Sequence, residues 1–326
     1  MKHGNKTIVL LASLLVGAAA LSGCDSGKTK VGILQFGTFE ALTNAKNGFV
    51  EALADEGFKD GEQIEITVKN PEADSATNSQ MAGVLAAASD LVYGIATPSA
   101  TALKNAVTSA GREIPVVFSA VTDPVGAKLV AALDQPGANV TGMSDLGPIS
   151  EELNLLAKFV GIDKVDTLYT STESNSVYQI AIARTTIAAN GWGETDHSVN
   201  NASEIASAIA AVSDDVDALF LPTDDTIAAN MAMVKNANES RAKPLIILGC
   251  DVGMIDGCVI AMGVDYFELG KQAGLMAAQI LTGTDPADIP VGTGDSSLLD
   301  INKTWADALG VAIPAEILAT TGAEIK

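Results

Sequence analysis

Short apolar segments alternate with longer segments of mixed apolar and polar residues along most of the chain. The short segments carry Val, Ile, Leu and Ala at successive positions, which is typical of strands that are buried on both faces. Strands are predicted at residues 30–35, 63–70, 90–97, 114–122, 139–145, 165–170, 194–199, 217–223, 244–250, 258–264 and 298–302. Helices are predicted between them at residues 41–57, 75–89, 98–111, 149–160, 176–190, 201–212, 226–239 and 266–283.

This order of elements indicates the fold class. Strands joined through helices form parallel sheets that are covered on both faces, and the pattern restarts near residue 149. The sequence therefore predicts an α/β protein with two doubly wound parallel-sheet lobes and a ligand cleft between them.

The first residues do not follow the alternation. Two lysines precede an apolar run at residues 8–20, which has the length of a secretory signal and is too short for a comfortable membrane span. The sequence Leu21-Ser22-Gly23-Cys24 then resembles the lipobox of bacterial lipoproteins. This resemblance implies a signal peptide over residues 1–23, a lipid on Cys24 and a tether over residues 24–29.

We therefore expect an extracytoplasmic protein that is anchored to the bacterial cell membrane by a lipid on Cys24. The alternative is a plain signal peptide that is followed by an incidental cysteine. No later run is long and apolar enough to span a membrane, so the lipid would be the only contact with the bilayer.

The chain is strongly acidic. Its formal net charge is −21, and removal of residues 1–23 takes away two lysines and no acidic residue, so the mature charge becomes −23. A body of this charge repels nucleic acids and anionic lipids. Nucleic acid is therefore excluded as a partner, and we expect a monomer without a cofactor.

Two further cysteines, Cys250 and Cys258, flank a short predicted loop. Outside the cytoplasm such a pair forms either a disulfide or two buried free thiols, and the sequence leaves both arrangements open. Metal binding is not expected, because the chain has two histidines and His3 is lost with the leader.

Ligands of open α/β sheets bind at the carboxyl ends of the strands, so the segments that follow the strands are the candidate site. These segments are rich in Ser, Thr, Asp and Asn, and several lead directly into helices. Each of them has an alternative role as an ordinary helix cap. The candidate ligand-binding residues are Thr38, Phe39, Thr97, Ser99, Thr122, Asp123, Ser171, Ser174, Asn175, Asp224 and Asp251.

The residue types of these segments indicate the kind of ligand. None of the arginines of the mature chain falls in them, so a guanidinium clamp for phosphate is missing, and neither tryptophan offers a platform for a sugar. Hydroxyl groups at helix starts suit a carboxylate. We expect the Ser and Thr side chains to hold a carboxylate, Asp251 with Asp123 or Asp224 to hold an ammonium group, and Phe39 to contact an apolar side chain.

Seven segments together resemble a known family. They are VGILQ, IATPSA, IPVVFSAVTDPVGAKLV, NVTGMSD, SNSV, PTDDT and VDYFELGKQA, in this order. The chain is similar to ABC transporter substrate-binding lipoproteins of the tryptophan/tyrosine-binding type. The resemblance implies a type I periplasmic-binding fold, an aromatic or apolar amino acid as the ligand, and a permease and an ATPase as partners.

The resemblance also implies the lobes and shows where this chain departs from the family. Lobe one is expected to comprise residues 30–144 plus 264–288, and lobe two residues 145–263 plus 289–326. Members often carry His and Pro where this chain has Phe39 and Glu40, and Asn where it has Asp225. These departures concern the identity of the ligand.

Three other functions are alternatives to this one. A binding protein for a sugar or another neutral solute would use the same fold. An enzyme is not expected, because G-x-S-x-G, Walker-type and G-x-G-x-x-G motifs and metal-spaced His/Cys sets are missing from the sequence. A transcription regulator would need a basic helix-turn-helix at the position of the leader.

Overall fold

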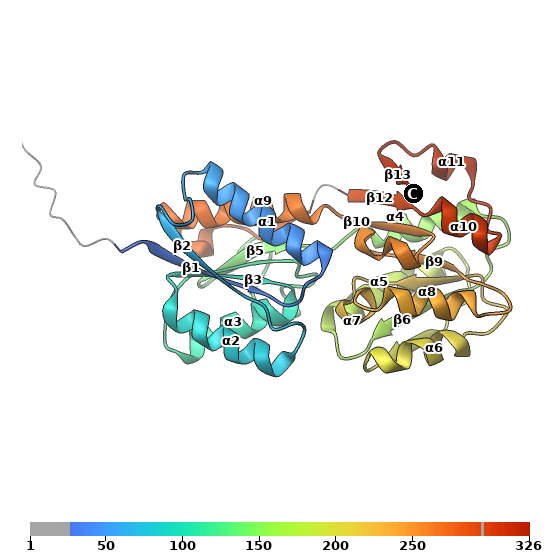
Figure 1. Cartoon of the computed structure of the whole chain (residues 1–326), viewed down its shortest axis with the longest axis horizontal. Helices are drawn as coiled ribbons and strands as arrows, with labels where there is room; N and C mark the ends of the chain where they lie inside the picture. The colour runs from blue at the N-terminus through green and yellow to red at the C-terminus, as the bar shows by residue number, and fades with distance from the viewer. Residues whose placement is uncertain (1–26, 295–296) are drawn as a thin grey trace, which may run out of the picture.

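The alternating segments of the sequence fold into two lobes, each built around its own sheet (Figure 1). This computed structural model describes residues 27–294 and 297–326. The predicted signal peptide and the Cys24 anchor lie outside the described residues. The two predominantly parallel α/β lobes confirm the predicted fold class.

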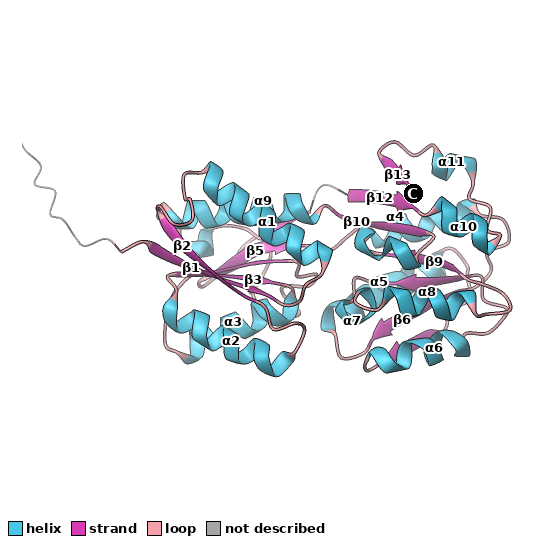
Figure 2. Cartoon of the chain, in the orientation of Figure 1, coloured by secondary structure: helices cyan, strands magenta, loops and turns pink. Residues whose placement is uncertain are grey.

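The first lobe has a six-stranded parallel sheet in the order β11-β5-β4-β3-β1-β2. Helices α1 and α9 cover one face of this sheet, and α2 and α3 cover the other (Figure 2). The strands are β1 (Thr29–Gln35), β2 (Ile64–Lys69), β3 (Leu91–Ile95), β4 (Val116–Ser119), β5 (Val140–Ser144) and β11 (Gly292–Thr293). The helices are α1 (Glu40–Asp55), α2 (Ser75–Ala88), α3 (Thr97–Ser109), α9 (Tyr266–Leu281) and the 3-10 turn η4 (Pro286–Asp288).

The apolar strand positions form the core because both faces of the sheet are covered. Along β1, Val31 and Ile33 pack in the cluster beneath α1 and α9, whereas Leu34 packs in the cluster beneath α2 and α3. The stacked rings of Phe49 and Tyr93, with centroids 3.9 Å apart, join α1 to the sheet. This double burial explains why the central strands β3 and β4 show no polar alternation in the sequence.

The second lobe has a seven-stranded sheet in the order β13-β12-β10-β9-β8-β6-β7. Its strands are β6 (Val165–Thr170), β7 (Asp196–Val199), β8 (Ala218–Leu221), β9 (Ile246–Gly249), β10 (Ile260–Val264), β12 (Ser297–Ile301) and β13 (Ala323–Ile325). Its helices are α4 (Ile149–Leu155), α5 (Ser174–Ala189), α6 (Ile205–Ala211), α7 (Asp225–Ala228), α8 (Met231–Glu239), α10 (Lys303–Leu309) and α11 (Ala315–Leu318). Single 3-10 turns are η1 (Leu156–Lys158), η2 (Ala202–Glu204) and η3 (Val252–Gly257).

The second lobe differs from the sequence prediction in several details. The helix predicted at residues 226–239 is divided at Asn230 into α7 and α8, and α10, α11 and β13 are additional to the predicted elements. Strand β12 runs antiparallel to β10, although the sequence predicts an all-parallel sheet. The reason is the path of the chain: β10 leads out to the first lobe, and β12 leads back from it alongside β10 (Figure 1).

The segment at residues 289–294 lies in the first lobe, although the boundary is expected after residue 288. Strand β11 pairs with β5 of the first sheet, and Thr141 Oγ1 donates a hydrogen bond to the carbonyl of Ile289 over 2.7 Å. Ile289 and Val291 are buried in the two core clusters of that lobe. Burial of these apolar side chains therefore keeps the segment with the first sheet until β12 begins.

Cys250 and Cys258 are two free, buried thiols rather than a disulfide in the structure. Cys250 Sγ lies 3.1 Å from Glu152 Oε2, to which it donates a hydrogen bond. The carboxyl of Glu152 is therefore buried inside the second lobe, beside Cys250, which directly follows β9.

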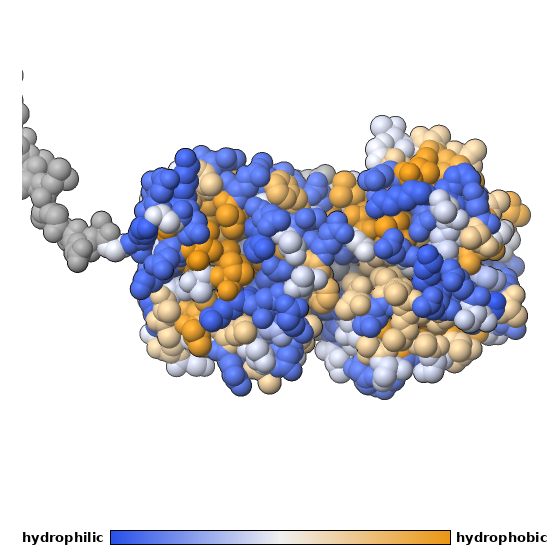
Figure 3. All heavy atoms as spheres, in the orientation of Figure 1, coloured by the Kyte–Doolittle hydropathy of each residue, from blue (hydrophilic) through white to orange (hydrophobic). Residues whose placement is uncertain are grey.

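The face shown in Figure 3 is largely hydrophilic, with apolar patches on both lobes. Among the described helices, none combines the length and the apolar character that crossing a bilayer requires.

Candidate ligand-binding cleft

Two connected spaces lie between the lobes, and both are lined by loops from each of them. The inner pocket has a volume of about 30 Å³ and is lined by Phe39, Ala41, Leu42, Ala96, Thr97, Ala120, Thr122, Asp145, Asn175, Thr223, Asp224, Asp225, Ala228, Asp251 and Tyr266. The outer groove has a volume of about 630 Å³ and lies between α2 and α3 of the first lobe and the starts of α5 and α7 of the second. Three residues line both spaces and mark their junction: Thr97, Asn175 and Asp225.

Helix N-termini form one part of the lining. The helices α1, α3 and α5 begin at the cleft after Phe39, Ala96 and Glu173, and none of these residues caps its helix through its side chain. Elsewhere the chain uses capping side chains, as Asp74 does for α2 and Asp265 for α9. The first-turn N–H groups of three long helices therefore give this part of the cleft a partial positive charge without any basic side chain.

Carboxyl groups form another part of the lining, and two of them already accept hydrogen bonds from backbone N–H groups. Asp224 caps α7 through Ile227 N at 2.9 Å and also accepts from Thr170 N at 2.7 Å and from Thr170 Oγ1 at 2.9 Å. Glu173 accepts from the backbone N–H groups of Asp225 and Thr226 over 2.8 and 3.0 Å. These two acids hold the loops of the second lobe together.

Asp251 and Asp225 are less engaged. Asp251 Oδ1 accepts from Gly253 N at 2.9 Å, and within residues 27–294 and 297–326 nothing donates to its Oδ2. For the carboxylate of Asp225, the same part of the chain provides no donor at all. Both side chains line the inner pocket, so their vacant acceptor positions are available to a ligand.

Asp145 lies on the crossover from β5 to α4, and Tyr266 lies on the crossover from β10 to α9. Tyr266 donates its hydroxyl hydrogen to Asp145 Oδ2 over 2.9 Å, and Thr122 Oγ1 donates to Oδ1 over 2.9 Å. Both Asp145 and Tyr266 are buried and line the inner pocket. Their hydrogen bond therefore connects these two crossovers between the lobes at the inner pocket.

Burial raises the pKa values of the carboxyl groups that line the two spaces. Desolvation raises the pKa of Asp251 to about 6, and desolvation with the charge of Asp224 raises the pKa of Glu173 to about 7. Burial also raises the pKa values of Asp145, Asp224 and Asp225. In the part of the chain that the structure describes, no Lys, Arg or His forms an ion pair with any of them.

The structure brings seven of the sequence-predicted residues to the cleft. The inner pocket contains Phe39, Thr97, Thr122, Asn175, Asp224 and Asp251, and the outer groove contains Ser174. Asn175 also donates from Nδ2 to the carbonyl of Thr223 over 2.9 Å, which ties the start of α5 to the end of β8.

The other four predicted residues lie outside this lining and have partners of their own. Thr38 is exposed and bonds to Glu72 and Asn70. The remaining three are Ser99, which is buried and donates to Asn78; Asp123, which accepts from Gly126 N; and Ser171, which bonds to Val199 and Asn200. These four residues therefore form hydrogen bonds within their own lobes, and do not line the cleft.

Asp145, Tyr266 and Asp225 line the inner pocket without being among the predicted site residues. Asp145 ends the predicted strand at residues 139–145, so the rule of strand ends contained the signal. Tyr266 begins a helix, and its partner lies 121 positions earlier in the chain, so no local pattern indicates their contact.

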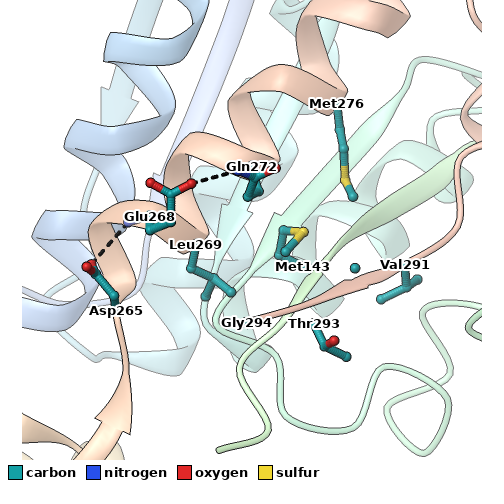
Figure 4. Close-up of a pocket in the computed structure, with 10 residues that line it drawn as sticks. Met143, Asp265, Glu268, Leu269, Gln272, Met276, Val291, Thr293 and Gly294 are labelled. Carbon is teal, nitrogen blue, oxygen red and sulfur yellow. Dashed lines mark hydrogen bonds between the residues drawn. The ribbon is translucent and has the colours of Figure 1, made fainter. Parts of the chain in front are cut away.

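A separate groove lies on the first lobe (Figure 4). Met143 of β5, Leu269 and Met276 of α9 and the segment from Val291 line it, and Glu268 accepts a hydrogen bond from Gln272 over 2.7 Å at its rim. Among the described residues, none from the cleft loops of the second lobe contributes, so this groove is distinct from the cleft.

Comparison with known proteins agrees with this arrangement. A family model described as ABC transporter substrate binding protein matches residues 30–325. A tyrosine-binding protein of Clostridioides difficile (strain R20291) is 34% identical over 95% of this chain and 93% of its own length. The chain belongs to the family of ABC transporter substrate-binding proteins.

Two solved relatives indicate how the lobes of this binding protein are arranged. An ABC domain in complex with L-Trp from Streptococcus pneumonia is 34% identical, with a TM-score of 0.85 over 92% of this chain and 100% of that one. The ligand-free, open structure of a substrate-binding protein with adhesive properties from Clostridium difficile is 32% identical, with a TM-score of 0.72 over 91% and 99%. At nearly equal identity and coverage, the present structure thus resembles the ligand-bound relative more than the open one.

Members of this family bind a solute without converting it, so the chain is a binding protein and not an enzyme. Within the described residues no group of three or more His, Cys, Asp or Glu side chains is arranged to hold a metal ion.

Proposed function

We propose that this substrate-binding protein is the extracytoplasmic lipoprotein of an ABC importer, and that its cleft binds an aromatic amino acid and delivers it to the permease. The observation that carries the proposal is the polarity of the inner pocket. Helix N-termini supply positive partial charge to its lining, and the carboxyl groups of Asp225 and Asp251, which have vacant acceptor positions, line it too. Such a lining matches an α-amino acid, which carries one carboxylate and one ammonium group.

The two charged groups of the ligand have different partners in this proposal. The starts of α1 and α3, with the hydroxyl of Thr97, hold the carboxylate; Thr122, whose hydroxyl donates to Asp145, lines the pocket beside them. Oδ2 of Asp251 accepts from the ammonium group, because this oxygen has no donor among the described residues. Phe39, which lines the inner pocket, lies against the side chain of the ligand where it leaves that pocket. The names of the relatives, one a tyrosine-binding protein and one an L-Trp complex, support an aromatic amino acid.

Titration calorimetry of the mature protein tests the ligand and its ammonium partner. Tryptophan, tyrosine, phenylalanine and leucine are compared with a matched set of sugars, and we expect binding of the aromatic amino acids only. Asp251→Asn should weaken that binding by about ten- to a hundredfold, because a charge-assisted hydrogen bond is worth roughly 1.5–3 kcal/mol.

Asp123→Asn is the matched control for this variant. Asp123 lies outside the lining, and the asparagine retains an oxygen for Gly126 N, so the affinity should stay unchanged. Sugar binding without amino-acid binding would contradict the proposal. Equal affinities of wild type and Asp251→Asn would remove only the ammonium assignment.

The anchor is tested separately by Cys24→Ser. We expect wild type in the membrane fraction with a lipid on Cys24, and the variant in the soluble fraction, because the cysteine thiol carries the lipid. A variant that stays membrane-bound, together with a wild-type protein that lacks lipid mass on Cys24, would contradict the lipoprotein assignment.

A further inference from the structure

Asp225 differs from every other acid of the inner pocket. Asp145 accepts two hydrogen bonds from side chains, Asp224 accepts three, and Asp251 accepts one. The side chain of Asp225 accepts none within residues 27–294 and 297–326, although its own backbone N–H is bound by Glu173. The dipeptide Asp224-Asp225 thus contains one carboxylate that is used by the fold and one that is not.

The position of Asp225 makes its carboxyl accessible to a ligand from both spaces of the cleft. It lines both the inner pocket and the outer groove, so it lies at the junction through which they communicate. The inner pocket, at about 30 Å³, has room for one small charged group such as an ammonium group, whereas the outer groove, at about 630 Å³, is far larger. A ligand whose head group occupies the inner pocket therefore directs its side chain past Asp225.

The surroundings of Asp225 disfavour a negative charge on its carboxyl. The carboxyls of Glu173, Asp224, Asp145 and Asp251 all lie near enough to disfavour its charge. Within the described residues no basic side chain offsets them. Asp225 is partly buried, and a ligand in the cleft would cover it further. A ligand that presents a hydrogen-bond donor then satisfies its oxygens, whereas a ligand of the same shape without a donor shields them from water and leaves them unpaired.

We propose that Asp225 is a specificity-determining residue, which accepts a hydrogen bond from a donor on the ring of the ligand. The cleft then selects aromatic amino acids with a ring hydroxyl or a ring N–H, such as tyrosine and tryptophan, over phenylalanine. This inference rests on the proposed function, since it assigns the ammonium group to Asp251 and the ring to the junction. Sites that hydrogen-bond a ligand hydroxyl discriminate strongly against the analogue that lacks it.

The test compares ligand pairs that differ by one donor. Affinities for tyrosine and phenylalanine, and for tryptophan and 1-methyltryptophan, are measured by calorimetry in wild type, Asp225→Ala, Asp225→Asn and Asp251→Asn. In wild type we expect the donor-bearing member of each pair to bind about ten- to a hundredfold more tightly. Lysine and norleucine are included to detect a side-chain ammonium group as the preferred donor.

The variants separate the role of Asp225 from that of Asp251. In Asp225→Ala the ratio of tyrosine to phenylalanine affinity should fall close to one, mainly because tyrosine binds more weakly. In Asp251→Asn both ligands should weaken equally, so that the ratio stays at its wild-type value. Asp225→Asn keeps an acceptor oxygen and should retain an intermediate ratio, which also guards against a poorly folded Asp225→Ala.

Three results would overturn the inference while leaving the proposed function intact. Phenylalanine could bind wild type as tightly as tyrosine, the ratio could survive in Asp225→Ala and Asp225→Asn, or lysine could bind more tightly than tyrosine. If no amino acid binds wild type, the proposed function itself fails.

Discussion

At the scale of the residue, Glu152 shows most directly what burial does to an acid in this protein. Its side chain is fully buried, one oxygen accepts from Cys250, and the other oxygen, Oε1, has no partner within the described residues. Desolvation raises its pKa to about 8. At neutral pH this environment therefore favours the protonated form of the carboxyl.

This predicts a pH dependence of stability that Glu152→Gln should reduce. A pKa that is raised on folding adds stability below the unfolded value near 4.5, and this stability is lost as the pH rises through about 8. Because a tenfold change in a proton-binding constant is worth about 1.4 kcal/mol, the loss reaches several kcal/mol. Glutamine stays neutral, so the variant should gain stability relative to wild type between pH 5 and pH 8.5.

Urea denaturation at pH 5, 7 and 8.5 measures this difference. The exposed Glu62 provides a control, because Glu62→Gln should show the same difference from wild type at every pH. A Glu152→Gln variant whose stability relative to wild type does not change with pH would show that Glu152 is ionised in the folded protein without cost.

At the scale of the element, the closest packing joins α1 and α9 above the first sheet (Figure 2). A Cβ atom at Gly270 would lie 2.0 Å from the carbonyl oxygen of Ala45, and one at Gly48 would lie 2.0 Å from that of Phe267. Both obstacles are backbone atoms, which cannot rotate away. Glycine is therefore required here by the approach of the two helices rather than by its own dihedral angles.

Gly270→Ala should therefore destabilise the protein by about 1–3 kcal/mol or more, because the helices must separate to admit the methyl group. Gly83 is a matched control in α2, where a Cβ atom would meet nothing within 4 Å. Gly83→Ala should stabilise by about 0.5–1 kcal/mol, since alanine is the better helix former. Thermal and urea unfolding measure both, and equal effects of the two substitutions would show that α1 and α9 can move apart freely.

At the scale of the whole molecule, crossovers of the chain join the two lobes. Asp145 begins the crossover that follows β5, and Tyr266 begins α9 directly after the crossover that follows β10. Their hydrogen bond of 2.9 Å lies in the lining of the inner pocket, so the proposed ligand site and the crossovers share these two side chains. A change in the distance between the crossovers alters this bond, and a ligand that stabilises the bond also favours one arrangement of the lobes.

Tyr266→Phe should therefore weaken ligand binding by about tenfold, because Asp145 then loses one of its two side-chain donors. Tyr93→Phe removes the same hydroxyl group from a buried tyrosine that bonds to Ser119 in the core of the first lobe. That control should lower stability without changing the affinity for the ligand. Calorimetry measures the affinity of both variants, and thermal unfolding measures their stability. An unchanged affinity of Tyr266→Phe would show that the hydrogen bond between Tyr266 and Asp145 does not contribute to ligand binding.

The sequence by itself determined the order and type of most elements and the class of the fold. Strands such as β3 and β8 are apolar runs, and this pattern is local, so the residues of each run reveal it without knowledge of the rest of the chain. The same holds for the strand ends as the place of the cleft, because parallel strands bring their carboxyl ends to one edge.

The tertiary structure alone decided which polar side chains at those ends are available to a ligand. Asp224 and Asp225 are identical neighbours, yet Thr170 and Ile227 N engage only the first. Asp145 and Tyr266 meet across 121 positions, and β11 joins the first sheet through contacts with β5. The physical reason is that a hydrogen-bond acceptor is engaged by whichever donor the packing of distant segments brings within reach, and local sequence carries no record of that donor.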